Sequence, residues 1–156
     1  MPHGRGLLRF ARRLATDPSE AEDLVQETFL LAWRGFHQLA EGSSARAWLF
    51  RILINAHYGR MRKTKSAGTV VELTPAIRGG CSPASEHLEV NQALERLARD
   101  HRSVLLLAVV EGFTCREIAE ILDVPMGTVM SRLSRAREAM REALAPGDAR
   151  DARAVR

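Results

Sequence analysis

Arginine and serine side chains recur along residues 127–141 in a pattern that suits contact with a nucleic acid. This stretch contains four arginines and one glutamate, so its local charge is +3. Arginine can pair with guanine or hold a phosphate, and serine can hydrogen-bond a base edge or the backbone. The candidate contacts on the polar face of this stretch are Met130, Ser131, Ser134 and Arg135, with Arg132 at its flank. A solvated amphipathic helix packed on a small bundle would give a similar pattern, so both interpretations stay open here.

The elements around this stretch favour the first interpretation. Gly112 can end one helix, and Thr114 with Glu117 fits a capping box at the start of the next. Asp123-Val124-Pro125 then breaks that helix, because proline has no amide donor and suits the first turn of a following helix. The last helix has one apolar face, made by Val129, Leu133, Ala136, Met140 and Leu144. Two helices joined by a tight turn predict a helix-turn-helix, whose second helix enters the DNA major groove.

A second candidate surface lies on a helix expected from Pro18 to about Arg34, with Asp17 as its cap. Its outer face carries four acidic or amide side chains, Glu20, Asp23, Gln26 and Glu27. The helix dipole favours acidic residues in the first turn, but it accounts less well for the last two. Residues 1–65 hold 11 Lys and Arg against 6 Asp and Glu, a balance of +5. An acidic face within a basic half indicates a partner other than nucleic acid.

Residues 45–65 predict a long helix that Ser43 or Ser44 can cap. Its expected buried side is Trp48, Leu49, Ile52, Leu53 and Ala56. The other faces are polar or cationic, with an aromatic side chain among them: Arg46, Arg51, Asn55, Tyr58, Arg60, Arg62, Lys63 and Lys65. Such a mixture suits unpaired bases, which stack on rings and accept hydrogen bonds. A surface helix with a solubilising basic end is an equally good interpretation of this segment by itself.

The whole chain is predicted to be all-α, with two small helical domains. Apolar periods are helical nearly throughout its 156 residues, and β-branched runs are scarce. Residues 66–85 break every helical period with glycines and prolines, which is typical of a linker. The expected domains are therefore 1–65 and 86–145, and a disordered tail is expected at 146–156. The net charge of +4 is consistent with an acidic polymer as partner.

Several classes of protein are disfavoured by the sequence. Cys81 and Cys115 form no CxxC pair, so we expect neither a zinc site nor a disulfide framework, and the sequence assigns them no role. Paired catalytic carboxylates, metal-ligand spacings and phosphate-binding loops are not found, so an enzyme and a cofactor are not expected. The sequence has no run of membrane-spanning length and no secretory signal. We therefore expect a soluble, cytoplasmic protein with no membrane insertion.

Three stretches together resemble the extracytoplasmic-function (ECF) sigma factors of bacterial RNA polymerase. They are DPSEAEDLVQETFLLAW (17–33), ARAWLFRILIN (45–55) and EGFTCREIAEILDVPMGTVMSRLSRARE (111–138). They occur in the order and at the spacing of that family, and the resemblance covers nearly all of residues 7–144. It implies a region 2 domain, a linker in place of region 3, and a region 4 domain. It also implies promoter-specific initiation at the bacterial nucleoid, with core polymerase as partner through its β′ coiled coil and β flap, and control by an anti-sigma factor.

The resemblance also implies roles for individual residues. Asp23, Gln26 and Glu27 match positions that contact the β′ coiled coil. The segment 35–65 resembles the part that reads and melts the −10 element. In it Asn55 matches a residue that contacts an extruded base, Trp48 matches a helix-anchoring aromatic, Arg51 and Arg62 add cationic contacts, and Leu39 stands where an aromatic is common.

The helix from Gly127 onward resembles the reader of the −35 element. Ser131, Arg132 and Arg135 match DNA-contacting positions of the family. Met130 stands where a basic residue is frequent, and Ser134 stands where some members carry a larger side chain. An ordinary helix-turn-helix repressor or activator is the alternative, but it leaves the acidic helix and the Asn55 helix without a role.

Overall fold

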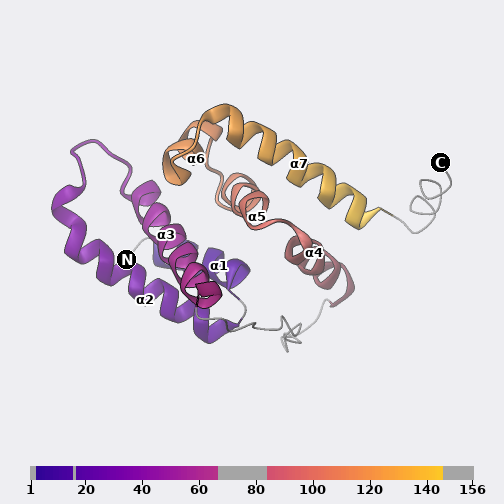
Figure 1. Cartoon of the computed structure of the whole chain (residues 1–156), viewed down its shortest axis with the longest axis horizontal. Helices are drawn as coiled ribbons and strands as arrows, with labels where there is room; N and C mark the ends of the chain where they lie inside the picture. Colours follow the sequence, from indigo (N-terminus) through magenta and orange to yellow (C-terminus); the bar gives the residue numbers. More distant parts are fainter. Residues whose placement is uncertain (1–2, 16, 67–83, 146–156) are drawn as a thin grey trace. The chain divides into compact units, whose positions relative to one another are not determined.

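The computed structural model of the chain describes residues 3–15, 17–66 and 84–145. Within these ranges every regular element is helical, which confirms the all-α prediction (Figure 1). The chain divides into two compact units, the first built from the helices of residues 4–66 and the second built around those of residues 84–105 and 126–144. The elements in chain order are α1 (Gly4–Leu14), α2 (Pro18–Gly35), η1 (Phe36–Gln38), α3 (Ala45–Ser66), α4 (Ala84–Arg96), α5 (Arg99–Leu105), η2 (Leu106–Val110), α6 (Cys115–Leu122) and α7 (Met126–Leu144).

The first unit is a bundle in which α2 packs against both α1 and α3 (Figure 1). Phe10 of α1 and Phe50 of α3 meet edge to face, with ring centroids 5.2 Å apart and planes at 74°. This is a favoured geometry for aromatic pairs, because the positive edge of one ring faces the negative face of the other. Leu7, Leu24 and Leu53 are fully buried and complete the core.

Helix α2 begins as the sequence predicts. The Asp17 carboxylate accepts a hydrogen bond from the backbone N–H of Glu20 at 2.8 Å, and Pro18 is the first helical residue. Buried Thr28 donates its hydroxyl proton to the carbonyl of Leu24 at 2.7 Å, so this polar side chain is satisfied within the helix. These local bonds fix the start of α2 and hence the position of its outer face.

Helix α3 differs from the prediction in the face that it buries. Ser44 caps it as expected, since its Oγ accepts from the N–H of Ala47 at 3.2 Å. The buried side chains, however, are Phe50, Leu53, Ile54 and His57. Trp48, Leu49, Ile52 and Ala56 are only partly buried. The stretch 48–54 is apolar at every position except Arg51, so its periodicity is compatible with burial of either of two overlapping faces. The face that contains Phe50 is the buried one, and Phe50 packs on Phe10.

In the second unit, α7 packs against α4 and α5. Arg102 links α5 to the end of α4. The Arg102 Nε donates to the carbonyl of Leu94 at 2.8 Å, and the Arg102 Nη2 donates to the carbonyl of Glu95 at 2.6 Å. These carbonyls belong to the last turn of α4, beyond which the regular helical bonds do not continue, and that of Leu94 also accepts from the N–H of Leu97 at 3.2 Å. After α5 the chain widens into the π-turn η2, in which the N–H of Glu111 donates to the carbonyl of Leu106 at 3.2 Å.

Three sequence predictions fall outside the described residues. The linker 66–85 lies almost wholly outside them, and so do the tail 146–156 and Cys81. The domain boundaries at 65 and 86 therefore stay predictions.

Candidate nucleic-acid and partner interfaces

The start of α6 is fixed by a reciprocal cap. The backbone N–H of Thr114 donates to Glu117 Oε2 at 2.8 Å, and the N–H of Glu117 donates to Thr114 Oγ1 at 3.2 Å. This is the predicted capping box, and it satisfies two amides that the helix leaves open. Gly112, with φ of +71°, makes the preceding reversal in a region that glycine enters without strain. Local signals thus position the first helix of the helix-turn-helix.

The turn between α6 and α7 is tight. Asp123 has φ of +53°, and the N–H of Val124 returns to the carbonyl of Ala119 at 3.1 Å. Aspartate is among the residues that adopt this left-handed conformation most readily. Pro125 lies one residue before α7 rather than in its first turn, and its carbonyl accepts the N–H groups of Thr128 and Val129. Pro125 is therefore the last residue of the turn, and its carbonyl accepts the first backbone hydrogen bonds of α7.

Helix α7 buries the first part of the predicted apolar face, whereas Leu144, which was predicted on that face, is exposed. Val129, Leu133 and Ala136 are buried in the second unit. The opposite face exposes four of the predicted contacts, Met130, Ser131, Ser134 and Arg135. The Ser131 hydroxyl donates to the carbonyl of Thr128 at 3.2 Å, which leaves its oxygen able to accept a hydrogen bond. The fold therefore presents one continuous exposed face along the first three turns of α7.

Arg132 is the exception among the predicted contacts on α7. Its side chain is only 26% exposed, and its Nη2 lies 3.2 Å from Asp100 Oδ2 on α5. Asp100 also lies beside Arg99, with Nε 3.5 Å from Oδ1. The guanidinium has further N–H donors, so it can pair with Asp100 and still offer a donor to another group. Arg132 is thus held at the edge of the exposed face by its own chain.

The predicted residues of α2 form a row along its outer side. Asp23 and Gln26 are exposed. Glu27 is partly covered, because its Oε2 accepts from Arg60 Nε at 2.8 Å and lies 2.5 Å from Arg60 Nη2. Arg60 comes from α3, so this ion pair joins the acidic helix to the basic one.

The same row continues into apolar side chains that were not predicted from the sequence. Leu30 is exposed and Trp33 is 84% exposed, and they follow Asp23 and Gln26 at steps of four and three residues. Residues at such steps share one side of a helix. Phe36, just after α2, is exposed as well. The signal was present in the sequence, because Leu30 and Trp33 lie off the stripe formed by Ala21, Leu24, Thr28 and Ala32.

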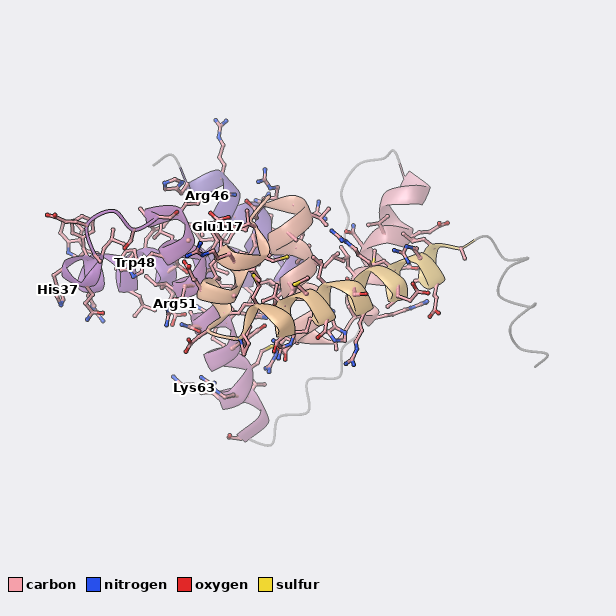
Figure 2. The ribbon with its side chains drawn as sticks, turned by 90° about the horizontal axis from the view of Figure 1, so that it is seen from above. His37, Arg46, Trp48, Arg51, Lys63 and Glu117 are labelled. Carbon is pink, nitrogen blue, oxygen red and sulfur yellow. The ribbon has the colours of Figure 1, made fainter. Side chains whose placement is uncertain are left out.

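Helix α3 brings most of the remaining predicted residues onto one side. Arg51, Asn55 and Arg62 are exposed at steps of four and seven residues. Trp48 lies one turn before Arg51 and is partly buried, and a Cβ atom built on Gly35 would lie 3.6 Å from its Cζ2. Its indole therefore packs close to the end of α2. Figure 2 shows Trp48 and Arg51 along the first half of α3 and Lys63 towards its other end.

Leu39 comes from a different segment. It follows η1, is partly buried, and donates its N–H to the carbonyl of Phe36 at 3.1 Å. The segment between α2 and α3 thus contains a short helix.

Across the described ranges no group of three or more histidine, cysteine, aspartate or glutamate side chains could hold a metal ion. None of the helices in those ranges combines the length and apolar character that crossing a bilayer requires.

The chain thus combines a bundle of three helices, α1 to α3, with a capped helix-turn-helix, α6 and α7. This combination is typical of a DNA-binding protein that has a second helical domain. Two known protein families match the chain. The family Sigma-70 region 2 matches residues 1–67, and the family Sigma-70, region 4 matches residues 87–140. The chain therefore belongs to the sigma-70 family, and within it to the ECF RNA polymerase sigma factors, as its relatives show.

Among the relatives is the ECF sigma factor SigL of Mycobacterium tuberculosis, 34% identical over 149 residues, or 89% of this chain and 82% of SigL. SigW of Bacillus subtilis is 31% identical over 148 residues, covering 85% of this chain and 79% of SigW. Among solved structures, the sigma factor RpoE in complex with the anti-sigma factor NepR from Bartonella quintana matches with a TM-score of 0.80 at 34% identity, over 92% of both chains. CnrH in complex with the cytosolic domain of CnrY matches with a TM-score of 0.70 at 28% identity, over 92% of this chain and 82% of CnrH.

Proposed function

We propose that this chain binds core RNA polymerase, directs it to promoters by recognising −35 and −10 elements, and assists in melting the DNA. The observation that carries the proposal is the exposed face of α7 with Ser131 and Arg135, which follows the capped helix α6 in a chain that matches both sigma regions. This face has the length, polarity and charge that a major-groove reader requires. The other surfaces are then assigned by their chemistry.

The outer row of α2 is proposed to bind the β′ coiled coil of the polymerase. Asp23, Gln26 and Glu27 supply acceptors for basic or polar groups of the partner. Leu30 and Trp33 extend the same row and supply apolar area, which is where protein interfaces concentrate their binding free energy. Trp33 is 84% exposed, so it is available to fill a pocket on a partner. The second unit would contact the β flap.

The exposed side of α3 is proposed to bind the −10 element. Asn55 offers both a donor and an acceptor to an extruded base, while Arg51 and Arg62 hold phosphates on either side. Trp48 anchors the start of the helix by packing close to Gly35. Leu39 would line the adjacent loop. Extruding a base costs a few kcal/mol, which stacking and hydrogen bonds in the protein can offset.

The exposed face of α7 is proposed to read the −35 element. Arg135 and Ser131 contact base edges or phosphates, with Met130 and Ser134 beside them. Arg132 contributes from the flank while Asp100 holds it. Because the two readers are separate small surfaces, each binds weakly, and joining them raises their effective concentration on one promoter. We expect the free chain to bind promoter DNA poorly and the holoenzyme to bind it specifically.

An anti-sigma factor is proposed as the regulatory partner. The support comes from two relatives of known structure, which are themselves complexes with NepR and with CnrY. Such a partner would compete for the α2 row or the α7 face. Co-purification of the chain with core polymerase tests the first step of the proposal.

Run-off transcription with core polymerase and a promoter library tests the proposal. The wild-type chain should direct initiation from a defined subset of promoters. Asn55→Ala and Arg135→Ala should each reduce initiation, whereas Arg96→Ala should not, because Arg96 lies exposed at the end of α4, on none of the proposed interfaces. Tight, sequence-specific binding of a −35/−10 duplex by the chain alone at physiological salt would contradict the proposed dependence on polymerase.

A further inference from the structure

Two methionines lie exposed at the start of α7. Met126 is the first residue of the helix and is 51% exposed, and Met130, one turn later, is 55% exposed. A single exposed apolar side chain is ordinary on a protein surface. Here two of them lie four residues apart, where helix geometry makes them neighbours. They form an apolar strip along one side of the start of the helix, and Met130 borders the exposed Ser131 and Ser134.

The position of this strip in the helix suggests its occupant. In a helix-turn-helix the N-terminal residues of the second helix contact base edges in the major groove. The other exposed large apolar side chain of α7, Leu144, lies at the opposite end. In the major groove, the base group that an apolar side chain can contact is the 5-methyl group of thymine. Ser131, Ser134 and Arg135, exposed beyond Met130 around the helix, provide the hydrogen bonds and charge that bring the helix to DNA.

We propose that Met130 selects thymine in the −35 element by packing its side chain against the 5-methyl group, with Met126 extending the apolar strip. The inference rests on the proposed function and adds a base preference to it. A methionine cannot donate hydrogen bonds to guanine O6 and N7, as an arginine or lysine does. Its unbranched, polarisable chain adapts to the methyl group without a fixed geometry. Where an arginine or lysine would favour guanine, Met130 should therefore favour thymine.

The first experiment selects −35 sequences from a randomised library with wild-type holoenzyme and with the Met130→Arg holoenzyme, the −10 element being constant. Wild type should enrich thymine at one position, and the variant should enrich guanine there. If wild-type holoenzyme selects no promoter, the proposed function fails. If it selects promoters whose base preferences Met130→Arg and Met130→Ala leave unchanged, the proposed function stands and the inference is overturned.

The second experiment removes only the methyl group. Deoxyuridine replaces the selected thymine, and the half-saturating holoenzyme concentration is measured on both DNAs. Wild type should bind the uracil promoter about fourfold more weakly, which is what burial of one methyl group contributes. The Met130→Ala holoenzyme should bind both DNAs equally. Deoxyuridine at a thymine outside the −35 element is the matched control. Equal uracil sensitivity in wild type and in Met130→Ala, or none in wild type, would overturn the inference.

Discussion

The ion pair between Glu27 and Arg60 allows the two proposed roles of the first unit to be separated. Glu27 Oε2 receives both Nε and Nη2 of Arg60, while the two side chains remain 40% and 33% exposed. Exposed pairs contribute about 0–1 kcal/mol, and the two charge-assisted contacts put this pair near the upper end. We expect Glu27→Gln and Arg60→Gln each to lower the free energy of unfolding by about 1 kcal/mol, or about 4–8 °C in Tm for a unit of this size.

The two substitutions should differ in their effect on polymerase binding. Glu27→Gln removes the carboxylate, so affinity for core polymerase should fall about fivefold, the equivalent of about 1 kcal/mol. Arg60→Gln leaves that carboxylate in place and removes its competitor within the chain. Its affinity for core polymerase should therefore equal or exceed that of wild type, although its stability falls by the same amount.

The measurement is competition with a labelled wild-type chain for core polymerase, beside urea denaturation of each variant. Glu95→Gln is the control, because Glu95 is an exposed glutamate of α4, in the other unit and on none of the proposed interfaces. It should leave polymerase affinity unchanged. The assignment of the α2 row is refuted if Arg60→Gln loses as much affinity as Glu27→Gln, or if Glu27→Gln loses none.

Three further outcomes are expected in the second unit. Asp100→Asn should release Arg132 and tighten holoenzyme binding to the −35 element about two- to fivefold, as measured by anisotropy over a range of salt; weaker binding would mean that Asp100 positions Arg132 for DNA. Thr114→Ala should lower the free energy of unfolding by about 1 kcal/mol in urea denaturation, because α6 loses its cap; an unchanged midpoint would contradict this. Gly112→Ala should lower it by about 1–2 kcal/mol through strain at positive φ alone, since a Cβ there would meet no atom within 4 Å, and Gly127→Ala is the unstrained control.

The elements that the sequence predicted well are those fixed by short-range chemistry. The Asp17-Pro18 start of α2 and the Thr114–Glu117 cap of α6 each involve residues three or fewer positions apart. Such bonds form in the isolated segment and depend little on the rest of the fold. The turn at Pro125 was also predictable, apart from its position one residue before the helix. The exposed face of α7 followed because its apolar period is regular.

The features that were not predicted depend on contacts between distant parts of the chain. Residues 48–54 are so uniformly apolar that their own pattern does not determine which face of α3 is buried. The buried face is the one whose Phe50 contacts Phe10, forty residues earlier in the chain. The pairs Glu27–Arg60 and Asp100–Arg132 join residues more than thirty positions apart. No local rule relates charges at such separations. Their partners could only be found once the helices were packed.

These two ion pairs share a consequence for binding. In each unit one charged residue of the proposed interface, Glu27 or Arg132, is already held by an opposite charge from a neighbouring helix. Binding then exchanges one partly exposed ion pair for another, and such an exchange contributes about 1 kcal/mol at most. Most of the net gain must come from apolar side chains that are exposed in the free chain, above all Trp33 towards protein and Met130 towards thymine. The salt dependence of promoter binding should accordingly be weaker than the four arginines of residues 127–141 would suggest.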